Sequence, residues 1–177
     1  MNAKNLFAST AILALLTSSV AFASDNQNKA QRFKAELTAL NSSGVVAEVK
    51  LKLRDDKLNV KIEASGLEPG RIHPQHIHGH DDASINADCP TLIADVDGDN
   101  LVSVTEGLPN YGPIVLPLTP FDLVDDEGNL YYRTSISIDP SQLQALHNRA
   151  IVMHGMSVNG TYIPSLPIAC GQLKSND

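Results

Sequence analysis

Apolar and polar residues alternate along several stretches of this chain. Between residues 45 and 53 every second residue is apolar, and the residues between them are mostly charged. The same period of two runs through residues 33–39 and 58–64, and Asp55 and Asp56 separate two of these stretches as a turn. Because successive residues of a strand point to opposite faces, this pattern predicts antiparallel strands with one buried face, joined by hairpins.

The rest of the chain predicts further strands and one short helix. Asp139 and Pro140 have the character of an N-cap and a first helical position, which predicts a short helix through Leu146. Residues 80–120 are rich in Asp, Pro and Gly and predict a long irregular loop that carries function. Further strands are expected at residues 75–79, 131–138, 150–154 and 167–173. The predicted fold class is all-β, an antiparallel, Greek-key-type sandwich or barrel of about seven or eight strands with a long metal-binding loop.

The first residues have the features of an export signal. Lys4 precedes an apolar run at residues 6–16, and residues 21–23 form a small-x-small cleavage site. The apolar run is too short to span a bilayer, so we expect an exported protein, periplasmic or extracellular, with no membrane span. The domain organisation follows as a signal peptide at residues 1–23, a disordered polar leader at 24–31 and a single β-sandwich domain at 32–174.

The net charge indicates which classes of partner are expected, and the cysteine content indicates a disulfide. The formal net charge is −7, which argues against nucleic acid or anionic membranes as partners and favours metal cations. Cys89 and Cys170 are the two cysteines of the chain. In an exported protein such a pair favours one disulfide, closing most of the domain, over two free thiols that bind metal.

The histidines form the main candidate site. His76 and His78 are alternate residues of an expected strand, so their side chains share a face about 6.6 Å apart. An isolated His-x-His is most often a solvated turn, but His154 lies in a distant apolar strand and favours a metal site that only folding assembles. Imidazole suits copper, zinc, nickel and iron. The candidates for a fourth ligand are His80, His73 and Met156, although each methionine taken alone is more often a core residue.

An acidic segment matches the calcium loop of EF-hands. Residues 95–106 place acids at loop positions 1, 3, 5 and 12, and Asn100 occupies the sharp turn at position 6. The alternative is a solvated acidic loop. We expect no helix after it, because Gly107 and Pro109 would stop one. The expected calcium ligands are Asp95, Asp97, Asp99, the carbonyl of Leu101, Ser103 and Glu106.

Several short motifs together resemble a known family. His-Ile-His at residues 76–78, Cys89 eleven residues later, Val-Met-His at 152–154 and Ile-Ala-Cys-Gly at 168–171 resemble the copper/zinc superoxide dismutases. The chain is also similar to chordin-type (CHRD) domains, which carry Gly-Leu and His-Ile-His segments and end in Gly-Gln-Leu. In outline the resemblance covers residues 32–173. It implies that His76, His78 and His154 bind copper, and that a Cys89–Cys170 disulfide ties the long loop to the last strand.

The chain also departs from the dismutases. They take a bridging histidine and further zinc ligands from the loop after the first cysteine, whereas residues 90–146 contain no histidine. A zinc site is therefore not expected. Pro167 stands where the dismutases have an anion-guiding arginine, three residues before the second cysteine. Without that cation, superoxide lacks local electrostatic attraction.

Three functional hypotheses follow. The first is an exported, copper-binding, superoxide dismutase-like domain for copper handling or redox protection, with a calcium-ordered loop. The second is a non-catalytic CHRD-type binding or structural module stabilised by calcium. The third is an active copper-dependent superoxide dismutase. Metal ions are the expected partners in each of them, and the sequence identifies no protein partner.

Overall fold

A computed structural model describes residues 29–176 and confirms the all-β fold class. The strands are β1 (Gln31–Ala39), β2 (Val46–Arg54), β3 (Lys57–Ser65), β4 (Gln75–His78), β5 (Ile114–Pro117), β6 (Leu130–Ser137), β7 (Ala150–Val158), β8 (Thr161–Gln172) and β9 (Lys174–Ser175). The helices are α1 (Val104–Tyr111) and three 3₁₀ turns, η2 (Leu92–Ala94), η3 (Pro140–Leu143) and η4 (Leu146–Asn148). The predicted signal peptide lies outside the described residues. Of the predicted leader, residues 29–31 are described, and the last of them already belongs to β1.

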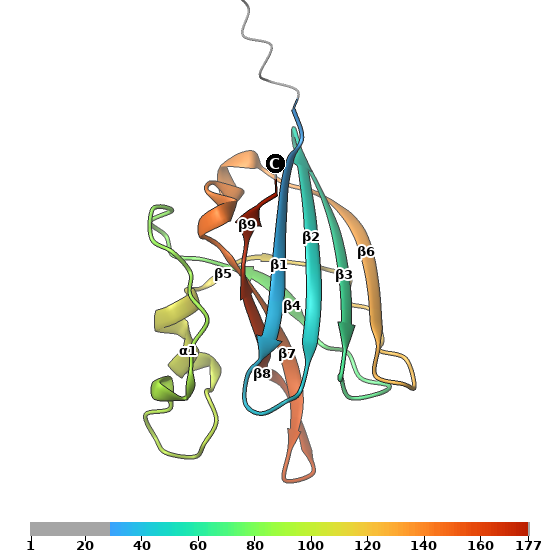
Figure 1. Ribbon diagram of the computed structural model, residues 1–177, viewed down its shortest axis with the longest axis vertical. Helices are drawn as coiled ribbons and strands as arrows, with labels where there is room; N and C mark the ends of the chain where they lie inside the picture. The colour runs from blue at the N-terminus through green and yellow to red at the C-terminus, as the bar shows by residue number, and fades with distance from the viewer. Residues whose placement is uncertain (1–28, 177) are drawn as a thin grey trace, which may run out of the picture.

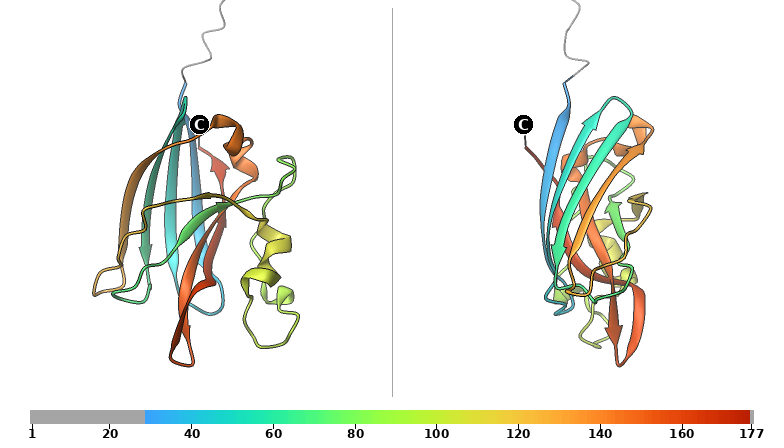
Figure 2. Two further views of the ribbon diagram at one scale, coloured as in Figure 1. Left: turned by 180° about the vertical axis from the view of Figure 1, so that it is seen from behind. Right: turned by 90° about the vertical axis from the view of Figure 1, so that its right-hand side faces the viewer.

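The strands form one antiparallel sheet that curls into a half-barrel. Its order is β5-β4-β7-β8-β1-β2-β3-β6, and β9 pairs with β1. The half formed by β1, β2, β3 and β6 lies in front of β4 and β7 in Figure 1, and Figure 2 shows the curl from two other sides. Neighbours such as β3 and β6, or β4 and β7, are far apart in sequence and need long connections, as in Greek-key folds.

The predicted alternation is confirmed in the core between the two halves of the sheet. Val49, Leu58 and Ile62 from the front half are fully buried. Ile77 and Ile151 meet them from β4 and β7. Burying one apolar face of each strand is the main stabilising term of such a fold, and it also specifies the register.

A second apolar cluster lies on the other face of β7 and β8. Val152 and Cys170 of the sheet pack there with Ala87 and Tyr111 from the long connection between β4 and β5. The predicted disulfide is confirmed, since Cys89 and Cys170 are bonded with 5.6 Å between their Cα atoms. This cluster and the disulfide hold the long connection against the sheet. Among the residues described, no helix is long and apolar enough to cross a membrane.

The expectation of a structureless stretch at residues 80–120 is wrong, because η2, α1 and β5 lie within it. Helix α1 forms although it contains Gly107 and Pro109. Ser103 and Glu106 make a reciprocal capping box at its start, which satisfies two of the free N–H groups there. Tyr111 is fully buried, and a Cβ on Gly107 would lie 2.4 Å from its ring. Tertiary packing thus favours a helix that local propensity disfavours.

Two other boundaries differ from the prediction. The helix expected after Asp139 is split into η3 and η4, because Ala145 adopts a left-handed φ of 51° between them. Asp139 still caps the first turn, accepting a hydrogen bond from the Ser141 N–H at 2.9 Å. The strand predicted at residues 167–173 is β8, which begins at Thr161, so that β7 and β8 form a long hairpin.

Candidate metal centre

The three predicted histidines converge on the face of the sheet that lies away from the main core. His76 and His78 stand opposite Val152 and Ala150, both members of the second apolar cluster. Partners in an antiparallel pair share a face, so the rings of β4 and β7 project together. One ring nitrogen from each of His76, His78 and His154 lies within 4.8 Å of the other two. That spacing allows one ion to contact all three.

Backbone carbonyls set the tautomers of two rings. Nδ1 of His78 lies 2.9 Å from the carbonyl oxygen of Gly112, and Nδ1 of His154 lies 2.8 Å from that of Ser165. Because a carbonyl oxygen can only accept, each Nδ1 carries the hydrogen and each Nε2 keeps a lone pair. A carbonyl behind the second ring nitrogen is typical of metal-binding histidines.

One nitrogen of each of the three rings is buried without a hydrogen-bond partner. Nε2 of His78, Nε2 of His154 and Nδ1 of His76 are inaccessible and make no hydrogen bond within the described part of the chain. A buried polar atom without a partner costs about 1–3 kcal/mol. Three such nitrogens, on rings that converge, are consistent with a ligand set for a cation.

Burial keeps these histidines neutral. It lowers the pKa of His154 to about 3, and the neighbouring His76 and His78 act in the same direction. Burial lowers the pKa of His76 to about 4, helped by His78. The pKa of His78 is lowered for the same reason, against the opposing effect of its bond to Gly112. Protons therefore do not compete with a cation for these nitrogens near pH 7.

These pKa values predict that the metal-free protein loses stability in mild acid. A histidine titrates near 6.5 in the unfolded chain, so the unfolded state binds more protons below that pH. For His154 alone, the free energy of unfolding should fall by about 2 kcal/mol between pH 7 and pH 5. Urea unfolding at both pH values should show a smaller fall for His154→Gln than for the parent protein. An equal fall in both would contradict the neutral, buried state of this ring.

Met156 does not join the three histidines. Gly155 adopts a φ of +106°, and the register of β7 against β8 shifts on both sides of His154, between Met153 and His154 and between His154 and Met156. The resulting bulge turns Met156 toward the main core, where it packs. The prediction that Met156 shares the side of His154 is therefore wrong. A side chain at position 155 would lie 2.0 Å from the Tyr162 hydroxyl, so the bulge depends on glycine.

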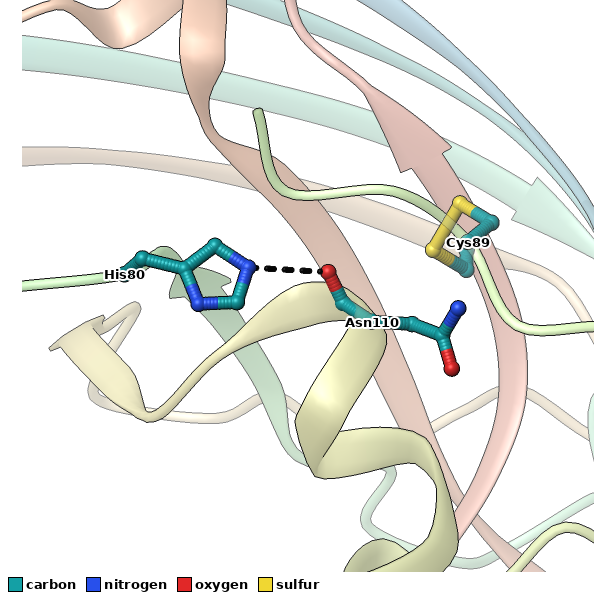
Figure 3. The surroundings of a disulfide bond; sticks show 4 residues. His80, Cys89 and Asn110 are labelled. Carbon is teal, nitrogen blue, oxygen red and sulfur yellow. Dashed lines mark hydrogen bonds between the residues drawn. A yellow bond between two sulfur atoms is a disulfide. The ribbon is translucent and has the colours of Figure 1, made fainter. Parts of the chain in front are cut away.

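His73 and His80 are also held elsewhere. The ring nitrogens of His73 lie 3.2 Å from the backbone carbonyls of His154 and Glu68. Nε2 of His80 donates to the carbonyl of Asn110 in α1 at 3.1 Å, as Figure 3 shows beside the disulfide. Neither ring is part of the converging group. A cavity lies beside the converging group and is lined by all three of its histidines.

This cavity has a volume of about 520 Å³. Its walls are largely apolar and come from α1, the start of β5, strand β8 and the loops near the histidines: Pro74, Val104, Leu108, Pro113, Ile114, Phe121 and Pro164. The ring of Phe121 meets His76 edge to face, with centroids 5.7 Å apart. None of the described residues that line the cavity is charged. The three histidine rings line this cavity, and no lysine or arginine in its walls attracts an anion.

The acidic loop folds around its own carboxylates. Asp95, Asp97 and Asp99 place one oxygen each within 4.8 Å of the others. Asp95 accepts hydrogen bonds from the N–H groups of Gly98 and Asn100 at 2.7 and 2.9 Å. Asn100 has the left-handed φ of 66° that a sharp turn requires, as predicted. The three carboxylates are partly or fully exposed, and such groups are common without an ion.

The remaining predicted calcium ligands have local roles. Glu106 accepts hydrogen bonds from the N–H groups of Val96 and Ser103, at 2.9 and 2.8 Å. These bonds and the Ser103 hydroxyl lower the pKa of Glu106 to about 2. The Ser103 hydroxyl caps α1, and the Leu101 N–H donates to Asp99 at 2.8 Å. Glu106 thereby joins the acidic loop to the helix that walls the histidine cavity.

The groups that surround the histidines could not be predicted from the sequence. The carbonyls of Gly112 and Ser165 and the apolar wall of α1 belong to segments whose position beside the histidines depends on tertiary packing. Neither a family model nor a curated protein matches this chain. The resemblance to the dismutases and to CHRD domains therefore rests on the short motifs.

Proposed function

We propose that this is an exported copper-binding protein, used for copper handling or redox protection, in which His76, His78 and His154 hold the metal. The observation that carries this proposal is the convergence of three buried ring nitrogens without hydrogen-bond partners. The carbonyls behind His78 and His154 support it, because they orient a lone pair toward the shared point.

Copper is favoured over the other imidazole-binding metals for two reasons. Divalent copper binds nitrogen ligands more tightly than zinc, nickel or iron at a given site. The motifs at residues 76–78 and 152–154 also resemble the copper ligands of the dismutases. No carboxylate of the described residues joins the three rings, which argues against a hard cation such as magnesium.

Copper binding without dismutase catalysis is favoured because the walls of the cavity are apolar and uncharged. Superoxide is an anion, and an uncharged apolar wall gives it no attraction in competition with water. If the protein is nevertheless a dismutase, its copper-loaded form should outperform free copper in a superoxide assay with a chelator present. A CHRD-type structural module is the remaining candidate, and such a module should melt identically with and without copper.

The test of the proposal is a metal competition. The disulfide-bonded protein is exposed to equal concentrations of copper, zinc and calcium, dialysed, and its bound ions are counted by mass spectrometry. We expect one copper ion per chain and no zinc at the histidines. Zinc in place of copper, or no transition metal, would contradict the proposal.

We also propose that the acidic loop binds calcium, which would order the connection that carries α1. The exposed carboxylates of Asp95, Asp97 and Asp99 and the turn at Asn100 support this. Affinity should be modest, because the loop stands alone rather than in a pair. Calcium would act as a folding aid whichever function the histidines have.

Calcium should raise the melting temperature of the parent protein but not that of Asp97→Asn. The asparagine oxygen can still accept the Asp99 N–H, which now donates to Asp97 at 3.1 Å, so the variant removes mainly one negative charge. Scanning calorimetry with calcium or with a chelator measures the difference. Asp126→Asn, in another exposed turn, is the control and should respond as the parent does. A parent protein indifferent to calcium would refute this site.

A further inference from the structure

The outer face of strands β1, β2, β3 and β6 concentrates the cations of an acidic protein. Alternation directs Leu51 of β2 and Val60 of β3 into the core, so the residues that flank each of them within its own strand project from the opposite, outer face. More than half of the chain's 13 lysines and arginines project from this face, although the net charge of the chain is −7. The face looks toward the viewer in Figure 1.

The cations are arranged in rows across the strands. Lys34, Lys50, Lys61 and Arg133 are register partners on four successive strands. Neighbouring strands lie about 4.8 Å apart, so this row places four positive charges within about 14 Å.

A second row runs beside the first. In it Arg32 stands opposite Lys52, followed by Asn59 and Ser135. Beyond it, Arg54 pairs with Lys57 at the end of the β2–β3 hairpin. Like charges placed directly opposite one another destabilise a sheet. A chain that keeps such an arrangement over two adjacent rows departs from local stability rules, and such departures concentrate at functional sites.

Acidic side chains neutralise only part of this face. Glu36, Glu48 and Glu63 form a third row on the other side of the first. Lys50 pairs with Glu48 at 2.8 Å and Lys61 with Glu63 at 2.7 Å. The hydrogen bond from Lys61, with the charges of Lys61, Lys50 and Arg133, lowers the pKa of Glu63. Lys34, Lys52 and Arg133 make no ion pair with any residue that the structure describes.

A hollow of about 540 Å³ lies over the two cationic rows. Lysines and arginines of both rows line it together with Asn59, Ser135 and Asn176. Charged groups beside amides and hydroxyls can bind both the anionic substituents and the hydroxyl groups of a sugar.

We propose that this face binds a linear acidic polysaccharide, whose carboxylate or sulfate groups lie along the two cationic rows. A linear chain can follow these rows without crossing the glutamates. An anionic membrane is an extended plane and would also meet the row of Glu36, Glu48 and Glu63. Single-stranded nucleic acid is disfavoured because no aromatic side chain of the described residues stands within the cationic rows to stack on bases.

The face lies on strands other than the histidine-bearing β4 and β7, so the inference does not depend on copper. The overall charge of −7 predicts cations as partners, but the folded chain separates its charges and presents one strongly basic surface.

Titration calorimetry with heparin, polygalacturonate and neutral dextran at about 50 mM salt tests the proposal. We expect binding to the two acidic polysaccharides, weakening as salt rises, and none to dextran. Lys52→Gln combined with Arg133→Gln should lower affinity about tenfold or more, because two unpaired cations are lost. Glu36→Gln should raise it. All three side chains are exposed or project from the outer face, so the fold should be retained.

Arg71→Gln is the matched control for Arg133→Gln. Arg71 is exposed and lies over the ring of Tyr162, away from the cationic rows, and its replacement should leave affinity unchanged. Absence of binding, or equal affinity in the Lys52→Gln/Arg133→Gln variant, would overturn the site. Tighter binding to phosphatidylglycerol vesicles or to single-stranded DNA than to either polysaccharide would overturn the choice of ligand.

Discussion

Replacing His154 with alanine should lower the copper affinity of this protein at least about a hundredfold, while the fold is retained. Loss of a group that merely orients a ligand typically costs 10–100-fold in metal affinity, and loss of the ligand itself should exceed that. The fold should survive because the His154 N–H still bonds to the carbonyl of Pro74 at 2.8 Å. The removed ring already borders the histidine cavity, so the alanine enlarges existing space. Competition with a chelator of known copper affinity measures the change.

Two control variants sharpen this experiment. His80→Ala and Met156→Leu remove two of the three side chains that the sequence suggested as a fourth ligand, and both variants should bind copper as the parent does. His80 is held by Asn110, and Met156 packs against the main core. If His80→Ala weakened copper binding as much as His154→Ala, the three-histidine site would be the wrong assignment.

Replacing both Cys89 and Cys170 with alanine should lower the free energy of unfolding by about 4.5 kcal/mol. The two residues are 81 positions apart, and the chain-entropy model gives about that value for closing so long a loop. Urea unfolding of the oxidised parent and of the double variant measures the difference. A loss below about 1 kcal/mol would mean that the unfolded chain is already compact, or that the loop is held by its apolar contacts alone.

The same variant should bind copper more weakly, although neither cysteine is a ligand. The disulfide holds the connection that ends in α1, and the Gly112 carbonyl behind His78 follows that helix. Adding copper should therefore stabilise the variant less than it stabilises the parent protein. If copper affinity were unchanged, the connection would be positioned independently of the disulfide.

The front strands could be predicted from the sequence because each buries one face. The alternation at residues 45–53 and 58–64 corresponds to β2 and β3 almost residue for residue. Helix α1 could not be predicted, because its stability depends on the burial of Tyr111 in a distant cluster. The β7–β8 hairpin had a readable signal in Asn159-Gly160, whose φ angles of 51° and 80° suit a tight turn, but Pro164 and Pro167 weaken the strand pattern after it.

The three histidines of the site could be predicted from the sequence. The His-x-His spacing and the resemblance to the dismutases select His76, His78 and His154, and the structure brings these residues together. The error over Met156 has a local cause, because the bulge at Gly155 breaks the period of two that placed both residues on one side. The carbonyl partners could not be predicted either. Gly112 and Ser165 lie 34 and 11 residues from the rings they orient, and a backbone carbonyl leaves no mark in the sequence.

Electron paramagnetic resonance of the protein loaded with one equivalent of copper(II) tests the central claim most directly. The account predicts a single copper species coupled to three imidazole nitrogens in the parent protein and to two in His154→Ala. A spectrum dominated by oxygen ligands, or one that His154→Ala leaves unchanged, would contradict the three-histidine copper site.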